Sequence, residues 1–159
     1  MSSRRWPATI NKEPVKRVCR LFVYGTLQPQ AGTRMGQWIA ARLIRSEPAS
    51  APGRLFAVRG GNGWFPALLP PRGGKHVVGT LCWLSLGPGD RALLDRYEGC
   101  EYRRVAAPVR TMEGQREVAQ FYLWHTTLPH DVEAIADGDF LAWLRRTRRS
   151  AFSTPRNGT

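Results

Sequence analysis

The chain has 159 residues, of which 42% are hydrophobic, and this composition suits one domain with a packed core. The formal net charge is +12, and no stretch approaches the roughly 20 consecutive apolar residues that a membrane-spanning helix needs. The first residues lack the apolar segment of a secretory signal, so we expect a cytoplasmic protein with no membrane partner.

The positive charge is concentrated at the two ends of the chain. Residues 1–20 hold six Lys or Arg and one Glu, and residues 144–159 hold five Arg and no acid, whereas the middle has thirteen bases and eleven acids. Basic ends attract polyanions weakly and without sequence preference. An association with nucleic acid would therefore depend on these ends, and we expect none from the body of the protein.

Cysteines and histidines form no metal-binding or disulfide pattern. The three cysteines are widely spaced without a Cys-x-x-Cys pair, and no histidine has a carboxylate at metal-ligand spacing. Neither a GxGxxG fingerprint nor a Walker loop occurs. We therefore expect buried free thiols, no metal and no cofactor.

The first part of the chain predicts a strand followed by a helix. Residues 1–16 are polar and basic, and we expect a disordered lead there. Residues 18–24 are rich in β-branched and aromatic side chains and predict a strand that ends at Gly25. Residues 34–41 have helical spacing.

Short strands and turns are predicted in the next segment. A second strand is expected to begin at residues 43–44 and to break over residues 48–53. Residues 53–58 predict a further strand. Residues 64–69 are apolar but contain Pro66, which suits an edge strand or an irregular segment.

The second half of the chain predicts a long strand at residues 76–84 and a helix from Pro88 to Glu98. Residues 102–111 and 117–124 indicate a hairpin. The acids at residues 137 and 139 can cap a last helix.

About six short strands with two or three helices, not in strict alternation, predict an α+β domain over residues 17–147. A small mixed β-barrel or a strongly curved sheet would fit this order of elements. Residues 148–159 are expected to form a basic C-terminal tail.

The loop after the first predicted strand is one candidate site, formed by Tyr24, Gly25, Thr26 and Leu27. A glycine directly after a buried strand lets the backbone turn sharply and approach a ligand closely. Consecutive N–H groups in such a turn can bind an anion, and Thr26 adds a hydroxyl. Taken alone, the segment is better explained as an ordinary turn between core elements.

Glu98 is the other candidate. It lies about 90° around the predicted helix from the apolar stripe within residues 93–97, at the boundary between core and solvent. Partial burial and the position in the last helical turn would both raise the pKa of its carboxyl, as a general acid/base requires. The alternative is a solvated glutamate paired with Arg103 or Arg104.

The spacing of these segments and of several others is shared with an enzyme family. Tyr-Gly-Thr-Leu at residues 24–27 is followed about 70 residues later by Leu-Asp-Arg-Tyr-Glu-Gly at 94–99, ahead of Tyr102. The other motifs are Gly-Arg-Leu at 53–55, Phe-Pro-Ala-Leu at 65–68, Val-Gly-Thr-Leu at 78–81, and Gly-Asp-Phe at 138–140 with Trp143.

Over residues 18–147 these motifs resemble the gamma-glutamylcyclotransferase-like family, which includes gamma-glutamylamine cyclotransferase and relatives in antibiotic biosynthesis. Thr80 stands where that family usually has an acid. The resemblance implies an enzyme that cleaves a small gamma-glutamyl amide: the α-amine of the substrate attacks its own γ-carbonyl and releases 5-oxoproline and an amine. The nucleophile is tethered, so the enzyme must mainly orient the substrate, move protons and stabilise an oxyanion.

The resemblance also implies roles for the candidate residues. Glu98 would be the general acid and base, and the Tyr24–Leu27 loop would hold the substrate carboxylate or the oxyanion. Tyr122 is equally well placed to be a packing residue of a strand. The residues implied to line the pocket are Tyr102, Tyr122, Phe65 and Pro66.

Two other functions remain open at this point. The fold could serve as a ligand-binding or interaction module without turnover. The protein could also associate with nucleic acid through its basic ends.

Overall fold

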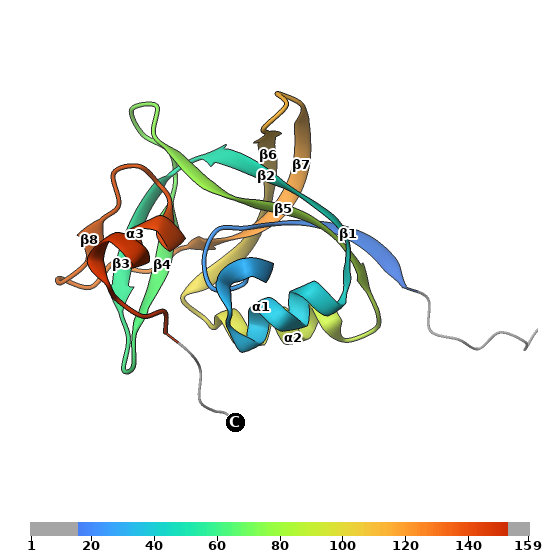
Figure 1. The fold of residues 1–159 in the computed structure, drawn as a ribbon, viewed down its shortest axis with the longest axis horizontal. Helices are drawn as coiled ribbons and strands as arrows, with labels where there is room; N and C mark the ends of the chain where they lie inside the picture. The colour runs from blue at the N-terminus through green and yellow to red at the C-terminus, as the bar shows by residue number, and fades with distance from the viewer. Residues whose placement is uncertain (1–15, 153–159) are drawn as a thin grey trace, which may run out of the picture.

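The computed structural model describes residues 16–152 and consists of a closed five-stranded barrel, a separate three-stranded sheet and three α-helices (Figure 1). This arrangement confirms the predicted α+β class and the mixed barrel. Almost all of the predicted lead at residues 1–16, and residues 153–159 of the predicted tail, lie outside the described residues. Within the described part, no helix combines the length and apolar character that a bilayer crossing requires.

The first half of the domain contains β1 (Arg17–Val23), the 3-10 helix η1 (Pro29–Ala31), α1 (Arg34–Ala41), β2 (Leu43–Pro52), β3 (Arg54–Arg59) and β4 (Trp64–Leu69). The second half contains β5 (His76–Leu86), α2 (Asp90–Glu98), β6 (Tyr102–Thr111), β7 (Arg116–Trp124), β8 (Glu133–Ala134) and α3 (Phe140–Thr147).

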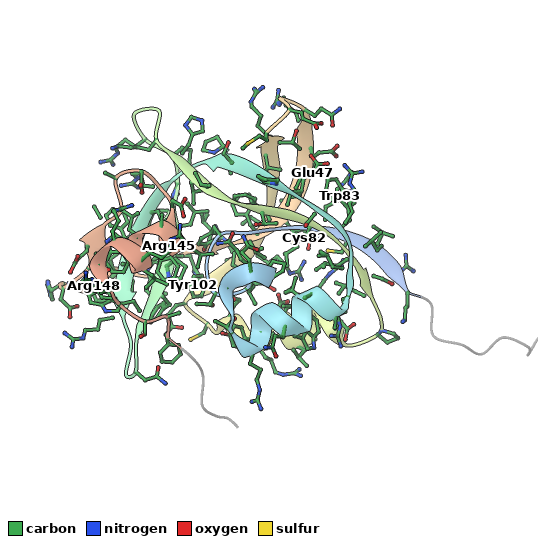
Figure 2. The ribbon with its side chains drawn as sticks, viewed as in Figure 1. Glu47, Cys82, Trp83, Tyr102, Arg145 and Arg148 are labelled. Atoms are coloured by element: carbon green, nitrogen blue, oxygen red, sulfur yellow. The ribbon has the colours of Figure 1, made fainter. Side chains whose placement is uncertain are left out.

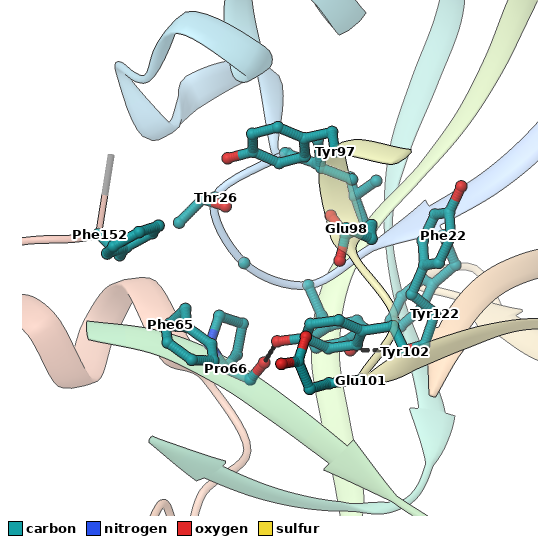
Figure 3. Close-up of a pocket in the computed structure, with 14 residues that line it drawn as sticks. Phe22, Thr26, Phe65, Pro66, Tyr97, Glu98, Glu101, Tyr102, Tyr122 and Phe152 are labelled. Atoms are coloured by element: carbon teal, nitrogen blue, oxygen red, sulfur yellow. Dashed lines mark hydrogen bonds between the residues drawn. The ribbon is translucent and has the colours of Figure 1, made fainter. Parts of the chain in front are cut away.

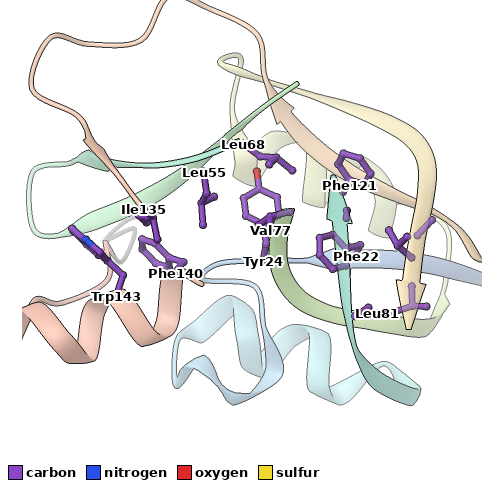
Figure 4. Packing of buried hydrophobic residues seen from close by; sticks show 14 of the residues in the cluster. Phe22, Tyr24, Leu55, Leu68, Val77, Leu81, Phe121, Ile135, Phe140 and Trp143 are labelled. Atoms are coloured by element: carbon purple, nitrogen blue, oxygen red, sulfur yellow. The ribbon is translucent and has the colours of Figure 1, made fainter. Parts of the chain in front are cut away.

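The barrel has the strand order β1-β5-β2-β6-β7. β5 pairs antiparallel with both β1 and β2, and β6 and β7 form the predicted hairpin. The barrel closes where Leu21 of β1 pairs in parallel with Gln120 of β7. Apolar side chains from alternate strand positions fill its interior, among them Phe22, Leu81 and Phe121 (Figure 4).

The second sheet has the order β4-β3-β8 and packs with α3. Phe140 and Trp143 of α3 enter the same core cluster as the barrel interior, and Trp64 of β4 lies 5.3 Å from Trp143, ring centroid to centroid. β4 is an edge strand, which is the position predicted from Pro66, because a proline removes one donor from a ladder.

The sequence predicts a break over residues 48–53, but β2 continues through Pro48 and ends at Pro52. The prediction is therefore wrong for residues 48–52. Pro48 accepts a hydrogen bond at its carbonyl from the N–H of Met112, next to β6. The backbone groups of residues 48 and 52 point to this same side of β2, away from β5. Neither proline therefore removes an N–H donor from the ladder between β2 and β5.

Two of the expected free thiols are buried and one is not. Cys19 and Cys82 lie in the core, whereas Cys100 follows α2 and is exposed. The prediction of a buried thiol at Cys100 was therefore wrong: the chain leaves the core where α2 ends at Glu98.

Residues 148–152 lie against the domain. Ala151 forms a parallel bridge with Trp64 of β4, so the C-terminal segment extends the edge of the second sheet. Arg145 lies in the last turn of α3 and Arg148 directly follows the helix, and both side chains are exposed (Figure 2).

Candidate functional site

A pocket of about 250 Å³ lies between the end of β1, the start of β4, the end of α2 and the β6–β7 hairpin (Figure 3). All nine residues singled out from the sequence line this pocket, although they come from segments far apart in the chain. They are Tyr24, Gly25, Thr26, Leu27, Phe65, Pro66, Glu98, Tyr102 and Tyr122.

The loop after β1 is fixed from two sides. The Gln28 N–H donates to the Gly25 carbonyl at 3.1 Å and closes a tight turn. The hydroxyl of Thr33 donates to the Thr26 carbonyl and also accepts from the Gly36 N–H at 2.9 Å, where it caps α1. One side chain therefore ties the loop to the start of the helix.

Gly25 is required by a close contact. A Cβ atom built at this position would lie 2.3 Å from Cγ of Pro66 on β4. The carbonyl of Pro66 in turn accepts a hydrogen bond from the hydroxyl of Tyr102. The loop, the edge of the second sheet and the start of β6 therefore meet at one proline, and this contact shapes the pocket wall.

A buried polar group lies behind the loop. The hydroxyl of Thr80 on β5 donates to Oε1 of Gln28 at 3.0 Å and accepts from Nε2 of Gln30 at 3.2 Å. Gln30 also donates to Gln28 at 3.1 Å, and Gln28 is only 4% exposed. The threonine in place of the family's usual acid thus holds a neutral amide pair under the loop, which the sequence did not indicate.

Glu98 ends α2 and is half-buried, with its carboxyl at the pocket. Burial, and after it the negative charge of Asp95, raise the pKa of Glu98 to about 8. Within residues 16–152 no side chain forms an ion pair with Glu98, and Arg104 pairs with Asp95 instead. The carboxyl is therefore open to a ligand and titrates near neutral pH.

Asp95 belongs to a network that the sequence analysis did not predict. Nε of Arg104 donates to its Oδ1 at 2.9 Å, and the hydroxyl of Tyr122 donates to the same oxygen at 2.7 Å. The hydrogen bond from Arg104 lowers the pKa of Asp95. The spacing in the sequence could have indicated that Asp95 lies near Glu98, since residues three apart lie on one helix face and Asp95 precedes Glu98 by one turn.

Three of the four tyrosines that line the pocket are held protonated by their burial, which raises the pKa of Tyr24, Tyr102 and Tyr122 above the ordinary value of 10. The hydroxyl of Tyr24 donates to the Tyr122 carbonyl. These rings therefore contribute shape and hydrogen bonds, while Glu98 is the group placed to exchange protons.

Five further lining residues were not proposed from the sequence. They are Phe22, Val23, Tyr97, Glu101 and Phe152, of which Phe152 comes from the C-terminal segment. No described lining residue is a Lys, Arg or His. In the described range 16–152, no three His, Cys, Asp or Glu side chains gather closely enough to hold a metal ion.

A family model described as "Gamma-glutamyl cyclotransferase, AIG2-like" matches residues 21–142 of this chain. The match spans every residue singled out for the site. No curated protein matches the sequence.

Several solved structures are similar in fold. An AIG2-like protein from Mus musculus has a TM-score of 0.64 at 20% identity, covering 89% of this chain and 99% of that one. A solution structure from Arabidopsis thaliana has a TM-score of 0.59 at 22% identity, covering 82% and 83%. YkqA from Bacillus subtilis has a TM-score of 0.63 at 20% identity, covering 83% of this chain and 43% of that longer chain.

Proposed function

The chain belongs to the gamma-glutamyl cyclotransferase, AIG2-like family, and on that premise we propose that it cleaves a gamma-glutamyl amide by intramolecular cyclisation, with Glu98 as general acid and base. The observation that carries the proposal is the Glu98 carboxyl, which borders a pocket, has no ion-pair partner within residues 16–152 and titrates near neutral pH.

The proposed reaction needs one proton relay. Ionised Glu98 takes a proton from the α-ammonium group of the substrate, and the freed amine attacks the γ-carbonyl carbon. A new C–N bond closes the five-membered ring, and the bond between this carbon and the leaving nitrogen breaks. Glu98 returns its proton to that nitrogen and then passes on the second proton of the attacking nitrogen in the same way, so the products are 5-oxoproline and the amine as its ammonium ion, and the carboxylate is regenerated.

The raised pKa suits both halves of this relay. A carboxyl with an ordinary pKa near 4.5 is a weak base towards an ammonium group and is too rarely protonated at neutral pH to act as an acid. A pKa of about 8 brings the group close to the working pH, where general acid/base catalysis is most effective.

The loop at Tyr24–Leu27 is proposed to bind the anionic part of the substrate. The lining of the pocket within residues 16–152 offers no basic side chain, so a substrate carboxylate or an oxyanion would rely on backbone N–H groups and the Thr26 hydroxyl. The ties from Thr33 to the loop support this role, because they fix the turn before the substrate arrives.

A screen of gamma-glutamyl compounds for released 5-oxoproline tests the proposal directly. We expect turnover of at least one gamma-glutamyl amide and none of the matching alpha-glutamyl amide, whose free amine cannot close the same ring on the scissile carbonyl. Saturable binding of such amides without any 5-oxoproline would instead identify a binding module of this fold.

A further inference from the structure

Phe152 borders the pocket although it lies ten residues beyond the end of the family match at residue 142. Its ring centroid is 5.7 Å from that of Phe65 on β4, in an edge-to-face arrangement. Figure 3 shows these two rings together at one end of the pocket, with Glu98 and Tyr122 at the other. The pocket therefore has an aromatic end and a proton-transfer end.

Backbone and side-chain contacts hold the segment that carries Phe152. The Trp64 N–H donates to the Ser150 carbonyl at 2.9 Å, and the Phe152 N–H donates to the Trp64 carbonyl at 2.7 Å. Arg149, which directly precedes Ser150, stacks over the Trp64 ring at 4.5 Å and forms a 2.8 Å ion pair with Glu133 of β8. The C-terminal segment is thus docked against both edge strands of the second sheet, β4 and β8.

Two glycines make room for this segment in the turn between β3 and β4. A Cβ atom at Gly60 would lie 2.5 Å from the ring of Phe152, and one at Gly63 would lie 2.6 Å from the backbone of Ala151. These close approaches show that the turn and the C-terminal segment fit one another, so the Phe152 wall is a built part of the pocket.

The direction of the substrate follows from amide geometry. The γ-glutamyl part must bring its amine to Glu98, and the two substituents of a trans amide point away from each other. A leaving amine bound in this way extends towards the end formed by Phe65 and Phe152. That end offers aromatic surface, and the exposed carboxylate of Glu101 lies beside Tyr102 in the same pocket (Figure 3).

We propose that Phe152 and Phe65 form a leaving-group subsite, in which Phe152 selects amides of amines that carry an apolar chain and no carboxylate. This inference rests on the proposed cyclotransferase function. An apolar chain gains by leaving water against two rings. An anionic chain would enter a pocket that is lined by the carboxyl groups of Glu98 and Glu101 and by no described basic side chain that could offset the repulsion.

The experiment compares three substrates: the gamma-glutamyl amides of methylamine, n-butylamine and 4-aminobutyrate. Rates of 5-oxoproline release give kcat/KM for the wild type, Phe152→Ala and Phe152→Leu. Met112→Ala, at an exposed apolar residue outside the pocket lining, is the control. We expect the wild type to prefer the butylamide over both other amides.

The decisive quantity is the ratio of kcat/KM for the butylamide to that for the methylamide. Phe152→Ala should lower this ratio about tenfold, equivalent to about 1.4 kcal/mol, mainly through KM. Phe152→Leu should restore part of the ratio, and Met112→Ala should leave it unchanged. An unchanged ratio in Phe152→Ala, even with both rates reduced, would show that the residue is merely structural and would overturn the proposal.

Binding separates this inference from the proposed function. Dissociation constants for the same amides are measured by calorimetry in a Glu98→Gln background, with and without Phe152→Ala. If the wild type turns over no amide but the binding preference depends on Phe152, the cyclotransferase proposal fails while the subsite stands. Equal affinities for the butylamide with and without Phe152, or no binding, would refute the subsite.

Discussion

Asp95 and Glu98 lie one turn apart on α2, and their carboxyl groups have pKa values that are moved in opposite directions. Arg104 holds the pKa of Asp95 low, whereas burial and the charge of Asp95 raise the pKa of Glu98 to about 8. Environments that separate the pKa values of neighbouring acids are a frequent basis for acid/base roles. The arrangement keeps one carboxylate ionised and leaves the other to exchange protons.

Glu98→Gln should abolish turnover without loss of the fold. The amide keeps the size of the side chain but cannot carry the proton, so we expect kcat to fall by roughly 10²–10⁴. Release of 5-oxoproline measures the loss, and the melting temperature should match or exceed that of the wild type at pH 7. Activity at the wild-type level would remove Glu98 from the mechanism.

Glu98 should also make the stability of the protein depend on pH. Its pKa is about 8 in the folded state against 4.5 in the unfolded chain, so its favourable contribution is complete below pH 4.5 and is lost as the pH rises through 8. The unfolding free energy of the wild type minus that of Glu98→Gln should fall on the order of a few kcal/mol between these pH values. Urea unfolding across this range gives the difference, and a constant difference would contradict the raised pKa.

Asp95→Asn should lower the pKa of Glu98, because it removes the adjacent negative charge and leaves Arg104 unpaired. We expect the acidic limb of the kcat/KM profile to move to lower pH by on the order of half a unit. Asp90→Asn is the matched control, since it breaks the ion pair with Arg42 at the far end of the same helix. A limb that moves equally in both variants would exclude a specific effect of Asp95.

Gly25→Ala should destabilise the protein and distort the site together. The new methyl group would meet the rigid ring of Pro66, and overpacking of this kind costs about 1–3 kcal/mol. Chemical unfolding and kcat/KM should both report the change. Gly61→Ala is the control because nothing lies within 4 Å of a Cβ atom there. Equal stability of the two variants would argue against the close contact.

The elements that the sequence predicted carry local signals. The apolar run ending at Gly25, the helical spacing of residues 34–41 and the predicted end of a helix at Glu98 each depend on neighbouring residues, and the structure has β1, α1 and the end of α2 there. The site residues were singled out together through the resemblance, and the fold brings them to one pocket.

Features that depend on pairing between distant segments were not predictable in the same way. Pro48 interrupts a strand only if its missing N–H would have bonded to a neighbouring strand. The arrangement of strands in the barrel decides this, and neighbouring residues in the sequence do not. The ion pair of Asp95 joins α2 to β6, so no single helix pattern indicates it. Phe152 lies in a basic segment without periodicity, and the pairing of residues 150–152 with Trp64 brings it to the pocket.

The closure of the barrel has a consequence for how the site comes into being during synthesis. The hydroxyl of Tyr24 reaches the carbonyl of Tyr122, 98 positions later, and β1 pairs with β7 at Leu21 and Gln120. During synthesis, β1 leaves the ribosome well before the β6–β7 hairpin that closes the barrel against it. Contacts of such long sequence separation slow folding. A nascent chain that ends before β7 therefore holds the loop of the site but has no pocket around it.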